Sequence, residues 1–213
     1  MKLVNHDTPE NAAILSRILA YTERNGKAGA LSEAFGNGPN GLVRSLDARI
    51  EDMKAVGICL NSRLLLRLIK ELATEALRQT VVGNRYDGPQ GPFLDYLFMS
   101  LSGMRVEKFE AVFLDDRDKV KAVETLSEGS IAHTAVYPRK AVEECLRLGV
   151  NQAIFVHNHP SGDAAASDTD KELIVTLDKS LAVAGFIVRD HLIIGGRGCW
   201  SAAGQGWSMG KRP

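Results

Sequence analysis

The chain has 213 residues, of which 45% are hydrophobic and 24% charged, and its 26 basic side chains balance 26 acidic ones. That length can bury a sizeable core over one or two domains, and the apolar and charged fractions exclude wholesale disorder, collagen and coiled coil. A net charge of zero argues against a nucleic-acid binder that works through its whole surface.

The sequence also indicates in which cellular compartment the protein is expected. It has no run of about 18 apolar residues, so we expect neither a spanning helix nor a membrane partner. The first residues, MKLVNHDTPEN, lack the apolar segment of a secretory signal. The three cysteines form neither a disulfide framework nor a C-x-x-C zinc site, because they are odd in number and far apart: Cys59, Cys145 and Cys199. A cytoplasmic protein is therefore predicted.

Residues 1–82 are predicted to form a helical module. Apolar side chains recur at helical spacing in three stretches, residues 10–24, 42–54 and 61–79. The next run, residues 83–93, is rich in glycine and proline, so we expect a linker there.

Residues 94–213 show a different pattern and are predicted to form a second domain. Short apolar or alternating segments predict strands over residues 107–114, 118–124, 151–157 and 186–194. Amphipathic segments predict helices over residues 94–102, 139–148 and 168–184. This alternation predicts an α/β (α+β) domain with a mixed sheet.

Two histidines and an aspartate form the strongest candidate site. His157 and His159 lie at the end of a buried apolar strand, and residues two apart on a strand point to the same face. After a turn, Ser167 fits the N-cap of the next helix, with Asp170 one turn in. Two imidazoles and one carboxylate, with a fourth position left for water, are typical of catalytic zinc.

Each part of this pattern also has an ordinary interpretation. Ser167-x-x-Asp170 resembles a helix capping box, which is common without any metal. A lone His-x-His pair can be two ordinary polar residues. The two features together favour a metal site.

The same residues carry a family resemblance. The spacing H-x-H-x(7)-S-x(2)-D is the motif of the JAMM (MPN-type) metalloproteases, and four residues match it: His157, His159, Ser167 and Asp170. With the strings VHNHPSGD, LDD and DHLIIG, the chain resembles the bacterial RadC family within that superfamily, well over residues 94–203 and more weakly over 42–78. The resemblance implies a helical N-terminal module followed by a JAMM/MPN-type (cytidine-deaminase-like) mixed-sheet domain.

The family also has a glutamate on an earlier strand, in the pattern E-x-F. Glu107 matches this pattern, and alternation along the strand places it on the face of Phe109, with Glu110 on the opposite face. A solvent-exposed glutamate at a strand end is the alternative. Weaker candidates for the same role are Glu110, Glu124 and Glu128.

The resemblance implies one zinc ion per chain and hydrolysis of an amide bond in a peptide or protein, often an isopeptide bond in JAMM proteases. Glu107 would take a proton from the water and pass it to the leaving amine. Ser167 would hydrogen-bond the oxyanion. His191, among apolar neighbours on its strand, is predicted to be a hydrogen-bonded structural histidine, with a ligand role as the alternative.

Residues 54–77 resemble the helix-hairpin-helix region of RadC proteins, where a G-x-G hairpin presents N–H groups to a DNA phosphate. Here Gly57 is present but Cys59 replaces the second glycine. A packing or homodimer module with a solvated helix face is therefore favoured, and we expect weak DNA binding or none.

Three functions follow from these patterns. The first is a zinc-dependent JAMM-type metallohydrolase, a peptidase or isopeptidase. The second is a DNA-binding repair accessory protein of the RadC family without peptidase activity. The third, an idle MPN-type scaffold, is disfavoured because its usual mark is loss of the ligands, and all are present here.

Overall fold

The structure is a computed structural model that describes residues 9–23, 46, 48, 50–129, 138–196, 198–207 and 209. The chain forms two compact units, Met1–Glu75 and Ala76–Pro213. The division falls within helix α5 (Leu60–Val81), so residues 83–93, the predicted linker, belong to the second unit.

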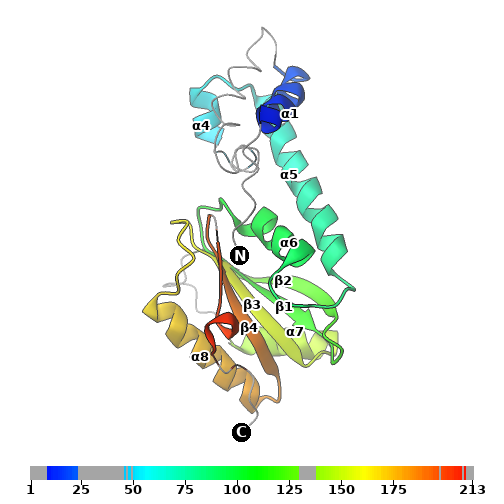
Figure 1. Cartoon of the computed structure of the whole chain (residues 1–213), viewed down its shortest axis with the longest axis vertical. Coiled ribbons are helices and arrows are strands. Elements are labelled where there is room, and N and C mark those ends of the chain that lie inside the picture. Colours follow the sequence, from blue (N-terminus) through cyan, green and yellow to red (C-terminus); the bar gives the residue numbers. More distant parts are fainter. Residues whose placement is uncertain are drawn as a thin grey trace. The chain divides into compact units, whose positions relative to one another are not determined.

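The described part of the first unit is helical, as its apolar spacing predicts. Its described elements are α1 (Pro9–Ala20), α4 (Ile50–Ala55) and the first part of α5 (Figure 1). Of the helix predicted over residues 42–54, most of the first half lies outside the described residues. Side chains from all three helices and from the hairpin after α4 form the core of the unit: Leu15, Leu19, Met53, Ile58 and Leu66.

The second unit is built on a mixed five-stranded sheet in the order β2-β1-β3-β4-β5. Its strands are β1 (Lys108–Leu114), β2 (Val120–Glu128), β3 (Gln152–Asn158), β4 (Ile187–Ile194) and β5 (Cys199–Ser201). All neighbouring pairs are antiparallel except β3 and β4, which are parallel and are joined through helix α8 (Asp168–Val183). The α/β architecture with a mixed sheet is therefore confirmed.

Helices cover both faces of this sheet (Figure 1). On one face, helices α7 (Pro138–Leu148) and α8 pack against alternate residues of β1 and β3, including Phe113 and Phe155. On the other face, α6 (Gly91–Leu101) packs against the intervening residues, including Val112 and Ile154. Burial on both faces explains why β3 is apolar almost throughout.

The run between α5 and α6 is tied to the sheet. Gly83 N–H donates to Val120 O (2.8 Å), Val120 N–H donates to Asn84 O (2.9 Å), and Tyr86 N–H donates to Asp118 O (2.8 Å). Helix α6 begins at Gly91, three residues before the predicted start at residue 94. The glycines and prolines here mark turns in packed chain. In the part of the chain that the structure describes, no helix has the length and apolar character needed to cross a membrane.

Candidate metal centre

The site begins at the end of β3. Every residue of this strand is buried between β1 and β4, and His157 is 0% exposed. His157 follows Phe155 by two residues, so its ring lies on the face that α7 and α8 cover. His159 comes just after the strand, where its N–H donates to Ile194 O of β4 (3.0 Å). The parallel neighbour therefore fixes the main chain that carries both rings.

The start of α8 supplies the carboxylate. Ser167 is the N-cap, and Asp170 N–H donates to its Oγ (3.2 Å), while Ser167 N–H donates to Asp170 Oδ2 (2.8 Å). The Ser167 hydroxyl also lies 2.6 Å from Oδ2, which it reaches as donor. The capping box is thus real, and it orients the same carboxylate that the metal hypothesis requires.

The structure brings His157, His159 and Asp170 together. Their ligand atoms all lie within 4.8 Å of one another. The two Nε2 atoms are 3.1 Å apart, and the carboxylate oxygens lie 3.2 Å from His157 Nε2 and 3.3 Å from His159 Nε2. A tetrahedral zinc ion with bonds of about 2.0 Å needs ligand separations of about 3.3 Å. These three residues therefore fit zinc in both chemistry and spacing.

Hydrogen bonds turn both imidazoles toward the cluster. His159 Nδ1–H donates to Asp163 O (2.7 Å), which leaves the lone pair on Nε2, as a metal ligand needs. His157 Nδ1 lies 2.9 Å from His191 Nε2. A proton on that Nδ1 leaves the His157 Nε2 lone pair facing the cluster, so His191 acts as the acceptor.

His191 is the hydrogen-bonded structural histidine that its apolar strand predicted. It is 0% exposed, and its ring lies against Phe109 and Phe155. Burial, with some help from the neighbouring His157, holds the pKa of His191 well below its ordinary value. A neutral imidazole can accept a hydrogen bond, so this environment suits its contact with His157.

Asp170 is held as an anion. Burial alone would raise the pKa of this carboxyl, but its contact with the His157 imidazole and its hydrogen bonds from Ser167 outweigh burial and hold the pKa below its usual range. A metal ligand must be deprotonated, so this electrostatic setting favours cation binding.

Glu107 lies just before β1, at the same end of the sheet as the cluster. The antiparallel register pairs Phe109 with His157, so continuing it by two residues sets Glu107 opposite His159. Phe109 belongs to the face covered by α7 and α8, and Glu107 shares that face by alternation. The register therefore favours Glu107 as the site glutamate.

The other candidate glutamates are placed differently. Glu110 alternates to the opposite face, is 2% exposed and pairs with Lys108 Nζ (2.6 Å). Glu124 on β2 forms an ion pair with Arg147 (3.1 Å). Glu128, also on β2, pairs with Lys108 in the β1–β2 register.

The cysteines of the second unit are poor nucleophiles. Burial raises the pKa of Cys145 to about 12. Burial and the nearby Asp190 raise the pKa of Cys199 to about 12 as well. Neither side chain is a thiolate at neutral pH, and the thiolate is the reactive form.

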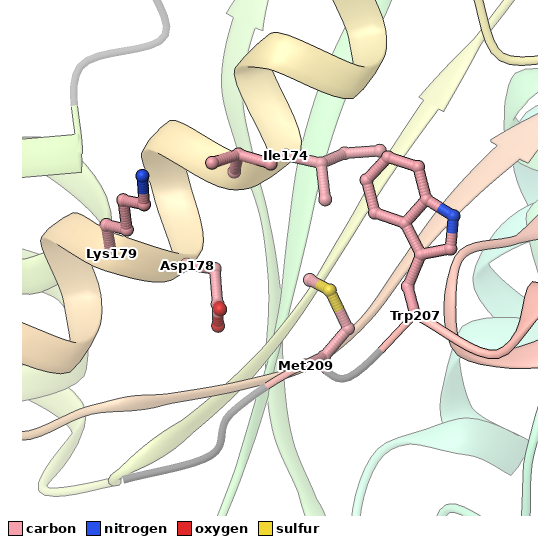
Figure 2. A pocket seen from close by; sticks show the side chains of 6 residues that line it. Ile174, Asp178, Lys179, Trp207 and Met209 are labelled. Atoms are coloured by element: carbon pink, nitrogen blue, oxygen red, sulfur yellow. The ribbon is translucent and has the colours of Figure 1, made fainter. Parts of the chain in front are cut away.

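A separate pocket of about 280 Å³ lies along α8 (Figure 2). It starts at Ile174, one helical turn beyond Asp170, and the C-terminal segment forms its other wall. Sequence patterns gave no indication of it, because that wall comes from irregular chain. Its lining residues are Ile174, Val175, Asp178, Lys179, Trp207 and Met209.

Comparison with known proteins assigns the second unit to a protein family. The family model described as "RadC-like JAB domain" matches residues 91–207, more than half of the chain. The chain belongs to the RadC-like JAB domain family. The resemblance to RadC proteins is thus confirmed, and the mixed sheet with helices on both faces is the fold of this RadC-like domain.

The RadC-like chain has relatives among the UPF0758 proteins. One from Nitrosospira multiformis is 37% identical over 141 residues, which is 66% of this chain and 63% of the relative. One from Acidovorax sp. is 34% identical over 179 residues, covering 83% of this chain and 75% of the relative. One from Leptothrix cholodnii is 34% identical over 181 residues, covering 84% and 79%. The match with the first of these spans slightly less than two thirds of that protein's length.

Proposed function

We propose that this RadC-like domain is a zinc-dependent hydrolase that cleaves an amide bond in a peptide or protein. The supporting observation is the convergence of two oriented imidazoles and one ionised carboxylate at the end of the sheet. When bound there, one zinc ion per chain would polarise the substrate carbonyl and lower the pKa of a water molecule to roughly 7.

The residues of the chain would divide the work. His157, His159 and Asp170 hold the ion, and Glu107 takes a proton from the attacking water. The water oxygen bonds to the carbonyl carbon, the C–N bond breaks, and Glu107 passes its proton to the leaving amine.

Ser167 is assigned first to the orientation of Asp170. Its hydroxyl donates to Asp170 Oδ2, so a hydrogen bond to the oxyanion would require the hydroxyl to rotate. The oxyanion role of Ser167 stays a prediction.

Zinc titration of the metal-free protein, followed by calorimetry, tests the metal site. We expect one zinc per chain, and loss of binding in His159→Ala and Asp170→Asn. Asp168→Asn is the matched control, because Asp168 lies in the same helical turn but is 94% exposed and bonds Lys171. Absence of stoichiometric binding, or equal loss in the control, would contradict the proposal.

Hydrolysis is tested separately with the zinc-loaded protein and a mixed peptide library. Mass spectrometry should detect new amino termini with the wild-type protein and none with Glu107→Gln. Equal cleavage by both proteins would point to a contaminating peptidase or to another base.

A further inference from the structure

We infer that Asn158 is the residue that positions Glu107, by hydrogen-bonding the main chain on both sides of it. The inference rests on the proposed function, which gives Glu107 its proton-transfer role. Asn158 is the middle residue of the His-Asn-His sequence, yet its side chain lies on the opposite face of β3 from the His157 ring.

The carboxamide of Asn158 makes two hydrogen bonds to the segment that carries Glu107. Its Oδ1 accepts from Lys108 N–H (2.8 Å), and its Nδ2 donates to Val106 O (3.1 Å). Asn158 is only 1% exposed, so competition from water is small. One buried side chain therefore fixes both peptide groups that flank Glu107.

The main chain of Glu107 is also held from the other side. In an extended chain, the groups flanking a residue point one way and its own carbonyl points the other. Glu107 O accepts from Gly129 N–H, which follows β2, at 2.8 Å. The segment is thus held between the β3 side and the β2 side by three hydrogen bonds.

The Asn158 side chain extends the hydrogen bonding of the sheet past the end of the β1–β3 ladder. The ladder between β1 and β3 ends at the pair Phe109 and His157, so Glu107 lies beyond the last main-chain pair. A carboxamide carries a donor and an acceptor, as a peptide group does, and it continues the ladder in place of main chain. Aspartate keeps only the acceptor, and alanine offers neither.

A second contact anchors the neighbouring residue. Lys108 Nζ bonds the buried carboxylate of Glu110 at 2.6 Å, on the face away from Glu107.

Accurate placement of the Glu107 carboxylate matters because a general base must lie within about 2.6–3.2 Å of its proton donor, and a displacement of about 1 Å can cost roughly 10²-fold in rate.

The test uses the full-length zinc-loaded protein with acetohydroxamic acid as the probe. A hydroxamic acid binds zinc as its anion, and a carboxylate beside the metal can take up the released proton. Its affinity therefore reports on Glu107 without any substrate. We expect Glu107→Gln and Asn158→Ala each to weaken hydroxamate binding by about 10–100-fold, the usual cost of losing an outer-shell partner.

A double-variant cycle decides whether the two residues act together. The protein with both substitutions should bind acetohydroxamate no more weakly than Glu107→Gln alone, because Asn158 acts through Glu107. Asn158→Asp, which is close in size, should show an intermediate loss, and it serves if Asn158→Ala does not fold. Gln152→Ala is the matched control: this buried carboxamide bonds Asp115 O (2.8 Å) at the other end of β3, and its loss should leave the affinity unchanged.

Other results would overturn the inference. Wild-type hydroxamate affinity in Asn158→Ala, or a further independent loss in the double variant, would show that Asn158 does not act through Glu107. A fall in zinc affinity with no change in hydroxamate affinity of the loaded protein would mean that Asn158 positions the histidines instead. If Glu107→Gln alone has no effect, the assignment of the base fails, and if the wild type takes up no zinc, the proposed function itself fails.

Discussion

Each unit contains a helix start that the sequence marks as a candidate binding site, and the two are built in opposite ways. At the start of α8, the capping box orients Asp170 toward two imidazoles, and the three offer a complete ligand set. Before the start of α5, Cys59 N–H donates to Glu23 Oε1 at 2.7 Å, so a carboxylate of the same unit already occupies that donor. The start of α8 brings three potential metal ligands together, whereas an N–H group before α5 is already hydrogen-bonded within its own unit.

The difference shows how reliably each sequence motif predicts a binding site. The metal pattern consists of side chains at fixed spacing, and these side chains themselves are the ligands. The hairpin pattern works through main-chain N–H groups that glycine leaves open. Here Gly57 keeps its positive φ of 81°, but Cys59 adds a side chain and Glu23 adds a negative charge where a phosphate would have to approach. We therefore propose that the first unit binds duplex DNA weakly or not at all.

The largest effect is expected at Glu107. The change Glu107→Gln should reduce hydrolysis by about 10²–10⁴-fold, because the amide cannot accept a proton at neutral pH. Zinc binding should persist, since Glu107 is not among the ligands. Rates of peptide cleavage and zinc stoichiometry, measured on the same preparation, check both statements.

Glu110→Gln is a control for Glu107→Gln, because Glu110 lies on the opposite face of the strand, but this change also affects a buried ion pair. It leaves Lys108 without its buried partner, so we expect lower stability with hydrolysis retained in the folded fraction. If Glu110→Gln were inactive and Glu107→Gln active, the assignment of these two glutamates to the two faces of the strand would be wrong.

The second effect concerns the support of the metal ligands. His191→Phe keeps a buried ring but removes the acceptor for His157 Nδ1–H, so zinc affinity should fall about 10–100-fold. Competition with a chelator of known affinity measures the change. Unaltered affinity would show that His157 needs no partner to present Nε2.

The pH dependence of stability should also depend on His191. The pKa of His191 is lowered by burial in the folded state, so below a pH of about 6.5 the unfolded chain binds a proton that the folded chain excludes. Stability of the metal-free protein should therefore fall as pH drops below that value, by at most about 1.4 kcal/mol per pH unit from this group. Urea unfolding in EDTA should show a shallower pH dependence for His191→Phe, and an equal slope in both proteins would contradict this account.

The smallest effect is expected in the first unit. Glu23→Gln removes the negative charge beside the N–H of Cys59, so any binding of the full chain to duplex DNA should strengthen by only a few-fold, about 1 kcal/mol or less. A salt titration measures the phosphate contribution. Tight binding by the wild type at physiological salt, lost when the basic residue near the start of α5 is changed (Arg63→Glu), would contradict this contrast between the two helix starts.

Much of the second unit could be predicted because its signals are local. Strands β1, β3 and β4 and helices α7 and α8 lie within one or two residues of their predicted bounds. Their alternating or helical apolar patterns and the glycine after α7 depend on nearby sequence. The convergence of His157 with Asp170 was likewise predictable, because one strand, one turn and one helix start carry it.

What escaped prediction depends on contacts between distant segments. The hydrogen bonds of Asn158 to Val106 and Lys108 join residues about 50 positions apart, and no sequence motif predicts such contacts. The hydrogen bonds of residues 83–86 to the chain at the start of β2 also join distant segments, as does the pocket wall formed by Trp207 and Met209. Glycine and proline marked the turns correctly but could not show what the turns pack against.

A crystal structure of the protein soaked in zinc, with the ion located by its anomalous scattering, tests the central claim most directly. The account predicts one ion per chain, at about 2.0–2.2 Å from His157 Nε2, His159 Nε2 and one carboxylate oxygen of Asp170. An ion bound elsewhere, or one that touches fewer than these three side chains, would contradict it.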